Sequence, residues 1–245
     1  MSNKSTSYQP MVSGEYAKTL RRWHEAVYDE MRERGEVRLS YFGREFVVPE
    51  DVFAPTPVSD LLGAAILNEV REYDRVLDMG TGCGVNAILA ASRSLDVIGV
   101  DINPHAVASA TANAVRNGVT DRATFVVSDV FDAVQGTFDL IVFDPPFRWF
   151  RPRDLLEASI ADENYRSLTR FIEQASGHLN PGGRILLFFG TSGDIDYLTS
   201  RIEREGFAHE TVATRSLLKD GLTVTYSTQR LIREDRGSTN SAPAT

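Results

Sequence analysis

An aspartate, two prolines and a phenylalanine, residues 144–147, follow the apolar run of residues 138–143. Pro145 and Pro146 fix their own φ angles, and a residue that precedes a proline is pushed into an extended conformation. Asp144 and the Pro145 carbonyl therefore form a rigid pair of hydrogen-bond acceptors beside the ring of Phe147. Such a pair suits a flat group that carries N–H protons. The same residue types also occur in ordinary surface turns, so the rest of the chain has to decide between these two interpretations.

A glycine-rich segment, Asp78-Met-Gly80-Thr-Gly82-Cys-Gly84, is the second group with chemical potential. It follows a strand-like run and precedes a helix expected at residues 85–91. Backbone N–H groups of such a loop, together with a helix N-terminus, form a site for a carboxylate or a phosphate. The segment also fits the G-x-G-x-x-A pattern of dinucleotide-binding proteins, so a nicotinamide oxidoreductase is an alternative.

Acidic residues accompany three successive strand-like segments. Asp78 lies in the first segment, Asp101 ends the second, and Asp129 ends the third. They are expected to line one edge of a sheet. A pyrophosphate would be poorly served by Asp78, whereas carboxylates attract a sulfonium cofactor that carries an amino group and accept hydrogen bonds from ribose hydroxyls and an adenine amine. The acidic residues therefore favour the sulfonium cofactor.

Strand-like and helix-like segments alternate from residue 75 onward. The strand candidates are residues 75–78, 96–101, 123–129, 138–144 and 184–189, and the clearest helix between them is residues 104–117. This alternation predicts a parallel sheet that is covered on both faces. Residues 210–218 and 222–233 flank Lys219-Asp-Gly221, which predicts an antiparallel hairpin. We therefore expect a Rossmann-like, doubly wound α/β fold with a mostly parallel seven-stranded sheet and an antiparallel C-terminal hairpin.

The N-terminal part of the chain has a different pattern. Apolar residues at helical spacing predict a helix at residues 15–34, and alternating residues predict a short hairpin at residues 37–48. We predict three segments: residues 1–55 as an N-terminal extension that serves as a lid or as packing, residues 56–234 as the main domain, and residues 235–245 as a disordered polar tail.

Composition narrows the choice of partners. The net charge of −8 and the pI near 5.1 argue against nucleic-acid binding through a broad positively charged surface. A local basic patch follows Phe147 and consists of Arg148, Arg151 and Arg153, with Trp149 and Phe150 between them. No apolar run approaches the roughly 20 residues of a membrane helix, and the N-terminus lacks an apolar signal core. One cysteine and four scattered histidines predict no metal site, and the expected location is the cytoplasm.

Residues 75–147 resemble the core of the class I S-adenosylmethionine-dependent methyltransferases. Asp-Pro-Pro-Phe resembles the Asn/Asp-Pro-Pro-Tyr/Phe motif of amino-methyltransferases, which include release-factor glutamine methyltransferases and enzymes that modify adenine N6 or guanine N2. Leu179-Asn-Pro-Gly-Gly183 extends the resemblance to about residue 190. The resemblance implies S-adenosylmethionine as the cofactor. The implied cofactor site has the glycine loop at the methionine end, Asp101 at the ribose and Asp129 at the adenine. Its predicted residues are Asp78, Gly80, Thr81, Gly82, Gly84, Asp101, Ile102, Asn103, Asp129 and Val130.

The implied reaction is methyl transfer to nitrogen. Asp144 and the Pro145 carbonyl would accept hydrogen bonds from the NH₂ group, and Phe147 would stack on it. The glutamine enzymes generally carry asparagine where this chain has Asp144, so base, guanidino and amine acceptors stay open. We favour a protein side-chain amide or a small nitrogenous metabolite as acceptor, with Arg148, Trp149 and Arg151 as substrate contacts. Trp149 is alternatively a core residue.

Other functions are kept as alternatives. An RNA or DNA base is the first, a nicotinamide oxidoreductase is more remote, and a non-catalytic scaffold is the third. The sequence leaves the oligomeric state open.

Overall fold

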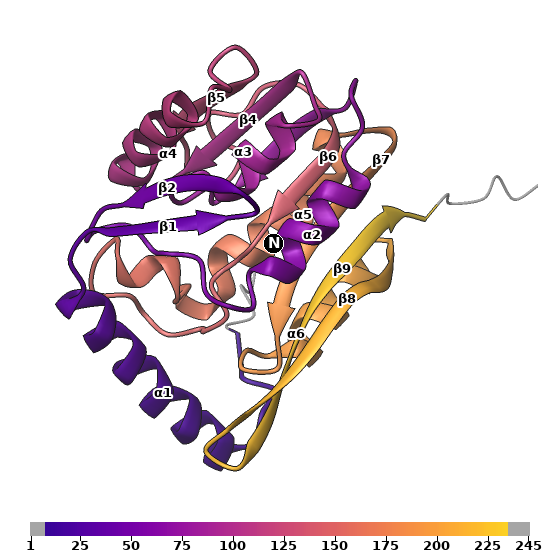
Figure 1. Ribbon diagram of the computed structural model, residues 1–245. Coiled ribbons are helices and arrows are strands. Elements are labelled where there is room, and N and C mark those ends of the chain that lie inside the picture. Colours follow the sequence, from indigo (N-terminus) through magenta and orange to yellow (C-terminus); the bar gives the residue numbers. More distant parts are fainter. Residues whose placement is uncertain (1–7, 235–245) are drawn as a thin grey trace, which may run out of the picture.

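The computed structural model describes residues 8–234, so the predicted tail at residues 235–245 lies outside the described residues. A seven-stranded sheet forms the centre, with the strand order β5-β4-β3-β6-β7-β9-β8 (Figure 1). Strands β3 to β7 are parallel, β9 runs antiparallel to β7, and β8 runs antiparallel to β9. The predicted sheet and its antiparallel hairpin are therefore confirmed. The strands are β3 (Arg75–Met79), β4 (Asp96–Asp101), β5 (Ala123–Val127), β6 (Phe138–Phe143), β7 (Leu179–Gly190), β8 (Phe207–Lys219) and β9 (Leu222–Arg233).

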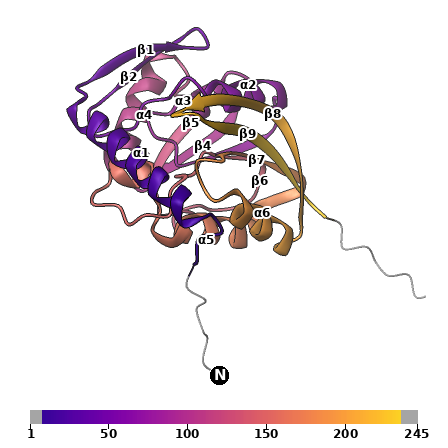
Figure 2. The same ribbon diagram turned by 90° about the horizontal axis from the view of Figure 1, so that it is seen from below.

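Helices cover both faces of this sheet (Figure 2). One face carries α2 (Asp60–Glu69), α3 (Val85–Ala91) and α4 (Pro104–Arg116), and the other carries α1 (Gly14–Glu33), α5 (Arg166–Ala175) and α6 (Ile195–Arg204). Short 3₁₀ helices are found at Glu157–Ser159, Glu163–Tyr165 and Ser176–His178. Among the helices described between residues 8 and 234, none has the length and apolar character needed to cross a membrane.

The strand sequences explain why both faces need a cover. Successive side chains of a strand point to opposite faces, and the apolar residues of β3 are buried on both of them. Val76 packs in the core on the α2 and α3 side, whereas Leu77 and Met79 pack in the core with α5 and α6. A strand that buries both faces must lie between two helical layers. Because the neighbouring strands are parallel, their carboxyl ends lie together at one exposed edge of the sheet.

The N-terminal elements are packed into these two cores. Leu20 and Trp23 of α1 join the core on one face, and Phe46 of the hairpin β1 (Val37–Tyr41) and β2 (Arg44–Val48) joins the other. The Asn113 side chain accepts a hydrogen bond from Val47 N and donates one to Val47 O, both at 3.0 Å, which fixes the hairpin against α4. The domain boundary at residue 55 stays a prediction, although the elements on both of its sides share their cores.

Several strand boundaries differ from the expectation, and two of the differences change where a predicted segment lies. β5 ends at Val127, so Asp129 lies in the loop after the strand, and β7 begins at Leu179, so the Asn-Pro-Gly-Gly segment belongs to the strand. A shift in the pairing of β6 with β7 between Phe138 and Leu140 accommodates that segment. Proline and glycine are tolerated at such an irregularity because a regular ladder of hydrogen bonds is not required there.

Candidate functional site

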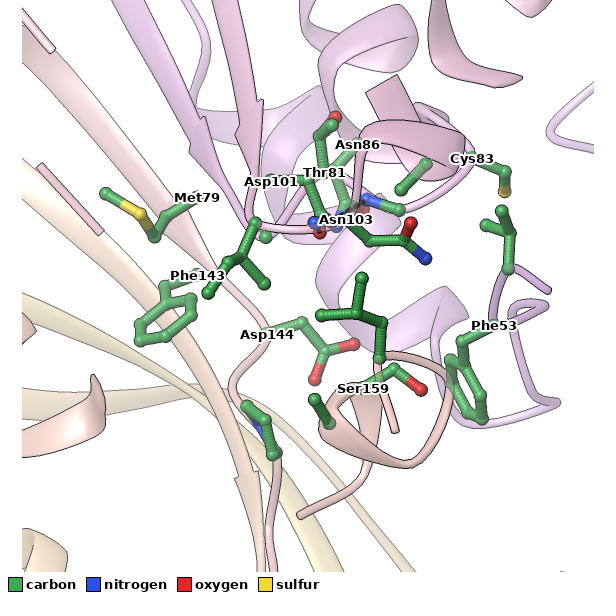
Figure 3. A pocket seen from close by; sticks show the side chains of 18 of the residues that line it. Phe53, Met79, Thr81, Cys83, Asn86, Asp101, Asn103, Phe143, Asp144 and Ser159 are labelled. Atoms are coloured by element: carbon green, nitrogen blue, oxygen red, sulfur yellow. Dashed lines mark hydrogen bonds between the residues drawn. The ribbon is translucent and has the colours of Figure 1, made fainter. Parts of the chain in front are cut away.

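A cavity opens where the parallel strands β3, β4 and β6 end. We call it the glycine-loop cavity. In open α/β sheets, ligands bind beyond the carboxyl ends of the strands at the point where the strand order reverses, and β3 and β6 flank that point here. Figure 3 shows Asp101, Thr81 and Asn103 on one side of this cavity and Asp144 and Ser159 on the other. The predicted residues that line it are Gly80, Thr81, Gly82, Asp101, Ile102, Asn103, Asp129, Val130, Asp144 and Pro146.

The glycine loop is held by its own hydrogen bonds. Thr81 N donates to Val100 O at 2.8 Å, and Gly84 N donates to Thr81 O at 2.8 Å. Gly84 has φ of 88°, and a Cβ there would lie 2.9 Å from the Cβ of Ala110, so a larger residue would push α4 away. The sequence predicted that the N–H groups of this loop receive an anion, but Gly82 N donates to Asp101 Oδ2 at 2.9 Å. The protein therefore supplies the anion for this N–H itself.

Asp78 organises the loop from below. It is 1% exposed, and its Oδ2 accepts hydrogen bonds from Thr81 Oγ1 at 2.6 Å and from Ala87 N at 3.0 Å. Burial raises the pKa of Asp78 to about 7, against the opposing effect of these two hydrogen bonds. Its other oxygen, Oδ1, is buried without a hydrogen-bond partner in the described part of the chain. Asp78 thus retains an oxygen that can accept a hydrogen bond.

Asp101 ends β4, and its carboxylate accepts hydrogen bonds both from the glycine loop and from the segment before α4. Oδ2 accepts from Gly82 N, and Oδ1 accepts from Asn103 N, both at 2.9 Å. Asn103 caps α4, because its Oδ1 accepts from His105 N at 3.0 Å. Each Asp101 oxygen has a second lone pair, so the carboxylate can still accept hydrogen bonds from a ligand.

Asp129 borders the cavity but is paired within the protein. Arg170 Nη1 lies 3.0 Å and Arg166 Nη2 lies 3.5 Å from its Oδ2. These two partners come from α5, and no local pattern around Asp129 indicates them. Val130 is buried with φ of 53°, and Ile102 is 48% exposed beside the same cavity. These two side chains give this end of the cavity apolar walls.

Asp144 lies directly after β6, as the motif predicted. No hydrogen bond to its carboxylate is found within residues 8–234, and the carboxylate borders the cavity (Figure 3). Burial, and secondarily the negative charge of Asp78, raise the pKa of Asp144 to about 7. Phe147 is half-buried, and its ring packs against Phe189 at 5.0 Å and Phe188 at 5.7 Å. The Phe147 carbonyl accepts from Tyr165 OH at 2.6 Å, which fixes the loop after the prolines.

A second cavity lies next to the first, and we call it the hairpin cavity because the tip of the β8–β9 hairpin contributes to it. The two cavities share five residues, which are Phe53, Ser59, Asp144, Pro146 and Ser159. Its further walls come from α1, from the segment before α2, from β7 and from β9. They include His24, Val27, Val58, Pro145, Phe147, Arg148, Ile160, Phe188, Ser192, Leu217, Lys219 and Tyr226. Asp144 therefore stands at the junction of two cavities.

The basic patch after Phe147 is divided by the fold. Arg148 lines the hairpin cavity, and its Nη1 donates to Ser192 O. Arg151 is exposed, and Arg153 pairs with Glu157 at 2.7 Å and Glu25 at 2.9 Å, so neither borders a cavity. Trp149 is 8% exposed and packs in the core against Tyr165 and Phe150. The structure thus brings only Arg148 of this patch together with Asp144.

Several cavity residues were missed by sequence reasoning. His24 lies on a helix read only as amphipathic, Lys219 lies at a hairpin tip, and Phe53 lies between prolines. Nothing in their local patterns indicates a site. Each of them lies more than 70 residues from Asp144 in the sequence, and only the fold brings them near it.

Comparison with known proteins identifies the family of this chain. A family model described as methyltransferase small domain matches residues 45–204. The release factor glutamine methyltransferase of Cereibacter sphaeroides is 34% identical over 168 residues, which cover 62% of this chain and 59% of that protein. The ribosomal RNA small subunit methyltransferase C of Haemophilus ducreyi is 34% identical over 129 residues, which cover 52% of this chain and 36% of that protein.

A solved structure shows the same fold. The crystal structure of a tRNA methyltransferase of M. jannaschii superimposes with a TM-score of 0.61 at 20% identity, covering 82% of this chain and 58% of that chain. The chain spans between 49% and 60% of the length of the first three curated relatives, all release factor glutamine methyltransferases. Since the family model covers more than half of the sequence, the chain belongs to the methyltransferase small domain family.

Proposed function

We propose that this protein is an S-adenosylmethionine-dependent N-methyltransferase that transfers a methyl group to a planar or amine nitrogen. The observation that carries the proposal is the position of Asp144 at the junction of two cavities, with no hydrogen-bond partner of its own in the described residues. A donor molecule in the glycine-loop cavity and an acceptor in the hairpin cavity would meet at this carboxylate.

The glycine-loop cavity has the groups that S-adenosylmethionine requires. Asp101 keeps lone pairs for ribose hydroxyls. Asp78 is buried and does not line the cavity, so it supports the glycine loop rather than a contact with the ligand. Ile102 and Val130 suit the two faces of the adenine ring. Asp129 is neutralised by Arg170, so its role is to accept a hydrogen bond from the adenine amine rather than to attract charge.

The acceptor residues orient a nitrogen. When bound, S-adenosylmethionine supplies a methyl carbon; the nitrogen lone pair forms the new N–C bond, and the electron pair of the broken C–S bond stays on sulfur. The nitrogen then loses a proton. Asp144 and the Pro145 carbonyl accept hydrogen bonds from its N–H groups and so direct its lone pair. With a pKa of about 7, the carboxylate of Asp144 can also receive the released proton near neutral pH.

The acceptor is a protein side-chain amide or a small nitrogenous metabolite. Release factor glutamine methyltransferases among the relatives support an amide nitrogen. A nucleic-acid base is less favoured, because the net charge is −8 and phosphate binding needs clustered positive charge. A nicotinamide oxidoreductase is disfavoured by the family match.

The proposal is tested with two measurements on the purified protein. Calorimetry with S-adenosylhomocysteine and with NAD should give saturable binding of the first alone. Labelled S-adenosylmethionine incubated with cell lysate, and then fractionated into protein, nucleic acid and small molecules, should place the label on a nitrogen of protein or metabolite. Binding of NAD alone, or the absence of any transfer, would contradict the proposal.

Replacing Asp101 with alanine should weaken binding of S-adenosylhomocysteine at least about tenfold, since hydrogen bonds to a charged group contribute about 1.5–3 kcal/mol. The loss includes the hydrogen bond that Gly82 N donates to Asp101 Oδ2 at 2.9 Å. Asp96→Ala is the matched control, because Asp96 begins the same strand at the opposite end and its side chain is 59% exposed. Equal affinities of the two variants in calorimetry would remove Asp101 from the cofactor site.

A further inference from the structure

Two positive side chains, Arg148 and Lys219, line the hairpin cavity. Neither forms a salt bridge within the described residues. Most other arginines near the sheet are paired with carboxylates, such as Arg184 with Asp74 at 2.8 Å and Arg215 with Asp60 at 2.8 Å. The hairpin cavity therefore holds two cations that no carboxylate of the described residues pairs with directly.

Arg148 is held in place by neutral groups. Its Nη1 donates to the Ser192 carbonyl, and its Nε is buried without a partner in the part of the chain that the structure describes. Burial lowers the pKa of Arg148, and the groups that oppose this effect are the hydroxyls of Tyr165, Tyr226 and Tyr16. Burying a guanidinium without a carboxylate costs free energy, which an anionic ligand would offset.

Lys219 is positioned by the contact between α1 and the tip of the hairpin, which extends beyond the sheet toward α1 (Figure 1). Its Nζ lies 4.9 Å from the centroid of the Trp23 ring. The neighbouring carboxylate of Asp220 is engaged elsewhere, since its Oδ2 accepts from Trp23 Nε1 at 2.8 Å and Arg22 Nη2 at 3.1 Å. Burial lowers the pKa of Lys219, the positive charge of Arg148 lowers it further, and the negative charges of Asp220 and Glu30 oppose these two effects.

The other walls set the shape of a ligand. Asp144 is the only carboxylate among the described residues that line this cavity, and it lies at the end that joins the glycine-loop cavity. Val27, Phe53, Val58 and Phe188 provide apolar walls between the charged groups. A glutamine side chain by itself would place only a neutral amide and hydrocarbon here, so it would leave both cations unpaired.

We propose that the acceptor is a small anionic metabolite that carries a planar or amine nitrogen, whose carboxylate or phosphate binds Arg148 and Lys219 while the nitrogen lies at Asp144. This inference rests on the proposed methyl transfer and narrows its acceptor. The nitrogen lone pair forms the bond to the methyl carbon, the electron pair of the C–S bond leaves with sulfur, and the proton of the nitrogen passes to Asp144 or water. The anionic group takes no part in the transfer and fixes the position of the nitrogen.

The test uses pairs of compounds in which one member carries an anionic group and the other does not: 4-aminobenzoate and its methyl ester, N-acetylglutamine and its amide, and adenosine monophosphate and adenosine. Each is added to the protein saturated with S-adenosylhomocysteine for calorimetry, and to protein with labelled S-adenosylmethionine for methyl transfer. At least one anionic member should bind about tenfold or more tightly than its neutral partner, and the carboxylate and phosphate pairs distinguish the two sources of negative charge.

The variant Lys219→Met should remove most of that preference by raising KM or Kd for the anionic compound, with binding of S-adenosylhomocysteine unchanged. Lys219→Glu should reverse the preference. Arg22→Gln is the matched control, since Arg22 also contacts the hairpin tip but is 67% exposed and does not line the cavity. Arg148→Met serves as a second cavity variant, checked by its melting temperature.

Two outcomes overturn the inference while the proposed function stands. One is binding of S-adenosylhomocysteine with no preference for the anionic members of any pair. The other is methylation of recombinant release factor at a rate that Lys219→Glu leaves unchanged. Failure of the proposed function has a different signature, which is the absence of S-adenosylhomocysteine binding by the unsubstituted protein.

Discussion

Replacing Asp144 with alanine is expected to lower kcat about 100-fold or more while changing the affinity for S-adenosylhomocysteine less than about threefold. A positioned acid or base contributes about 10²–10⁴ to a rate, and this carboxylate has no partner in the described residues that would make it structural. Single-turnover methyl transfer and calorimetry measure the two quantities separately. A variant with unchanged turnover would show that Asp144 is an ordinary turn residue.

The pH dependence gives a second readout of the same residue. Because burial and the charge of Asp78 raise the pKa of Asp144 to about 7, the ionised fraction rises through neutral pH. Methyl transfer is therefore expected to increase with pH up to about 8. Asp144→Asn keeps an oxygen acceptor but cannot ionise, so its activity should be lower and should lack this increase. Retention of the same pH profile by Asp144→Asn would assign the titration to another group.

Linkage predicts the effect of Asp144 on stability. The folded-state pKa of about 7 lies above the ordinary aspartate value of 3.8, so the unfolded chain loses its proton first as the pH rises. The free energy of unfolding is therefore lowered progressively between about pH 4 and pH 7, and by the full amount above pH 7. Asp144→Asn should remove this penalty and stabilise the protein at pH 8, on the order of 2 kcal/mol because the carboxylate borders a solvent-accessible cavity. At pH 4 the difference should vanish.

Local patterns were sufficient to predict the part of the site that is built from strand ends. The carboxyl ends of parallel strands meet at one edge, so Asp101 and Asp144 could be placed together from the order of segments alone. The glycine loop was predicted for the same reason. Its detailed bonding was not, because Asp101 supplies the anion for Gly82 N across 19 residues of sequence.

Contacts between distant segments explain what the sequence could not predict. Lys219 reaches the hairpin cavity because Asp220 bonds to Trp23, which is 197 residues away. Trp149 and Arg151 flank Arg148 on the same short segment, yet one is buried in the core and the other is exposed. The irregular backbone after Phe147 has no period from which side-chain directions follow, so a basic patch in sequence did not indicate which arginine faces the site.

One buried ion cluster determines how the N-terminal helix forms a wall of the hairpin cavity. Glu157 is 2% exposed, and its Oε1 lies 2.7 Å from His24 Nε2 on α1, while its Oε2 accepts from Arg153 Nε at 2.8 Å. Burial opposes ionisation of Glu157, but hydrogen bonds from Arg153 and His24 outweigh it and lower its pKa to about 2. Burial also lowers the pKa of His24, against the effect of Glu157.

Replacing Glu157 with alanine is expected to destabilise the protein by about 3 kcal/mol, because removing one partner leaves a buried polar cluster without compensation. That corresponds to a fall in melting temperature of roughly 6–12 °C for a chain of this size. In the unsubstituted protein, the contribution of Glu157 to the free energy of unfolding is complete above pH 4.5 and is lost as the pH falls toward 2. The variant should therefore show a weaker loss of stability with acid in this window.

Glu25→Ala is the matched control, since Glu25 pairs with the same Arg153 at 2.9 Å but its side chain is 43% exposed. This variant should cost less than about 1 kcal/mol of stability. Equal destabilisation by the two variants would mean that the exposed pair, and not the buried contact between Glu157 and His24, holds α1 against the cavity.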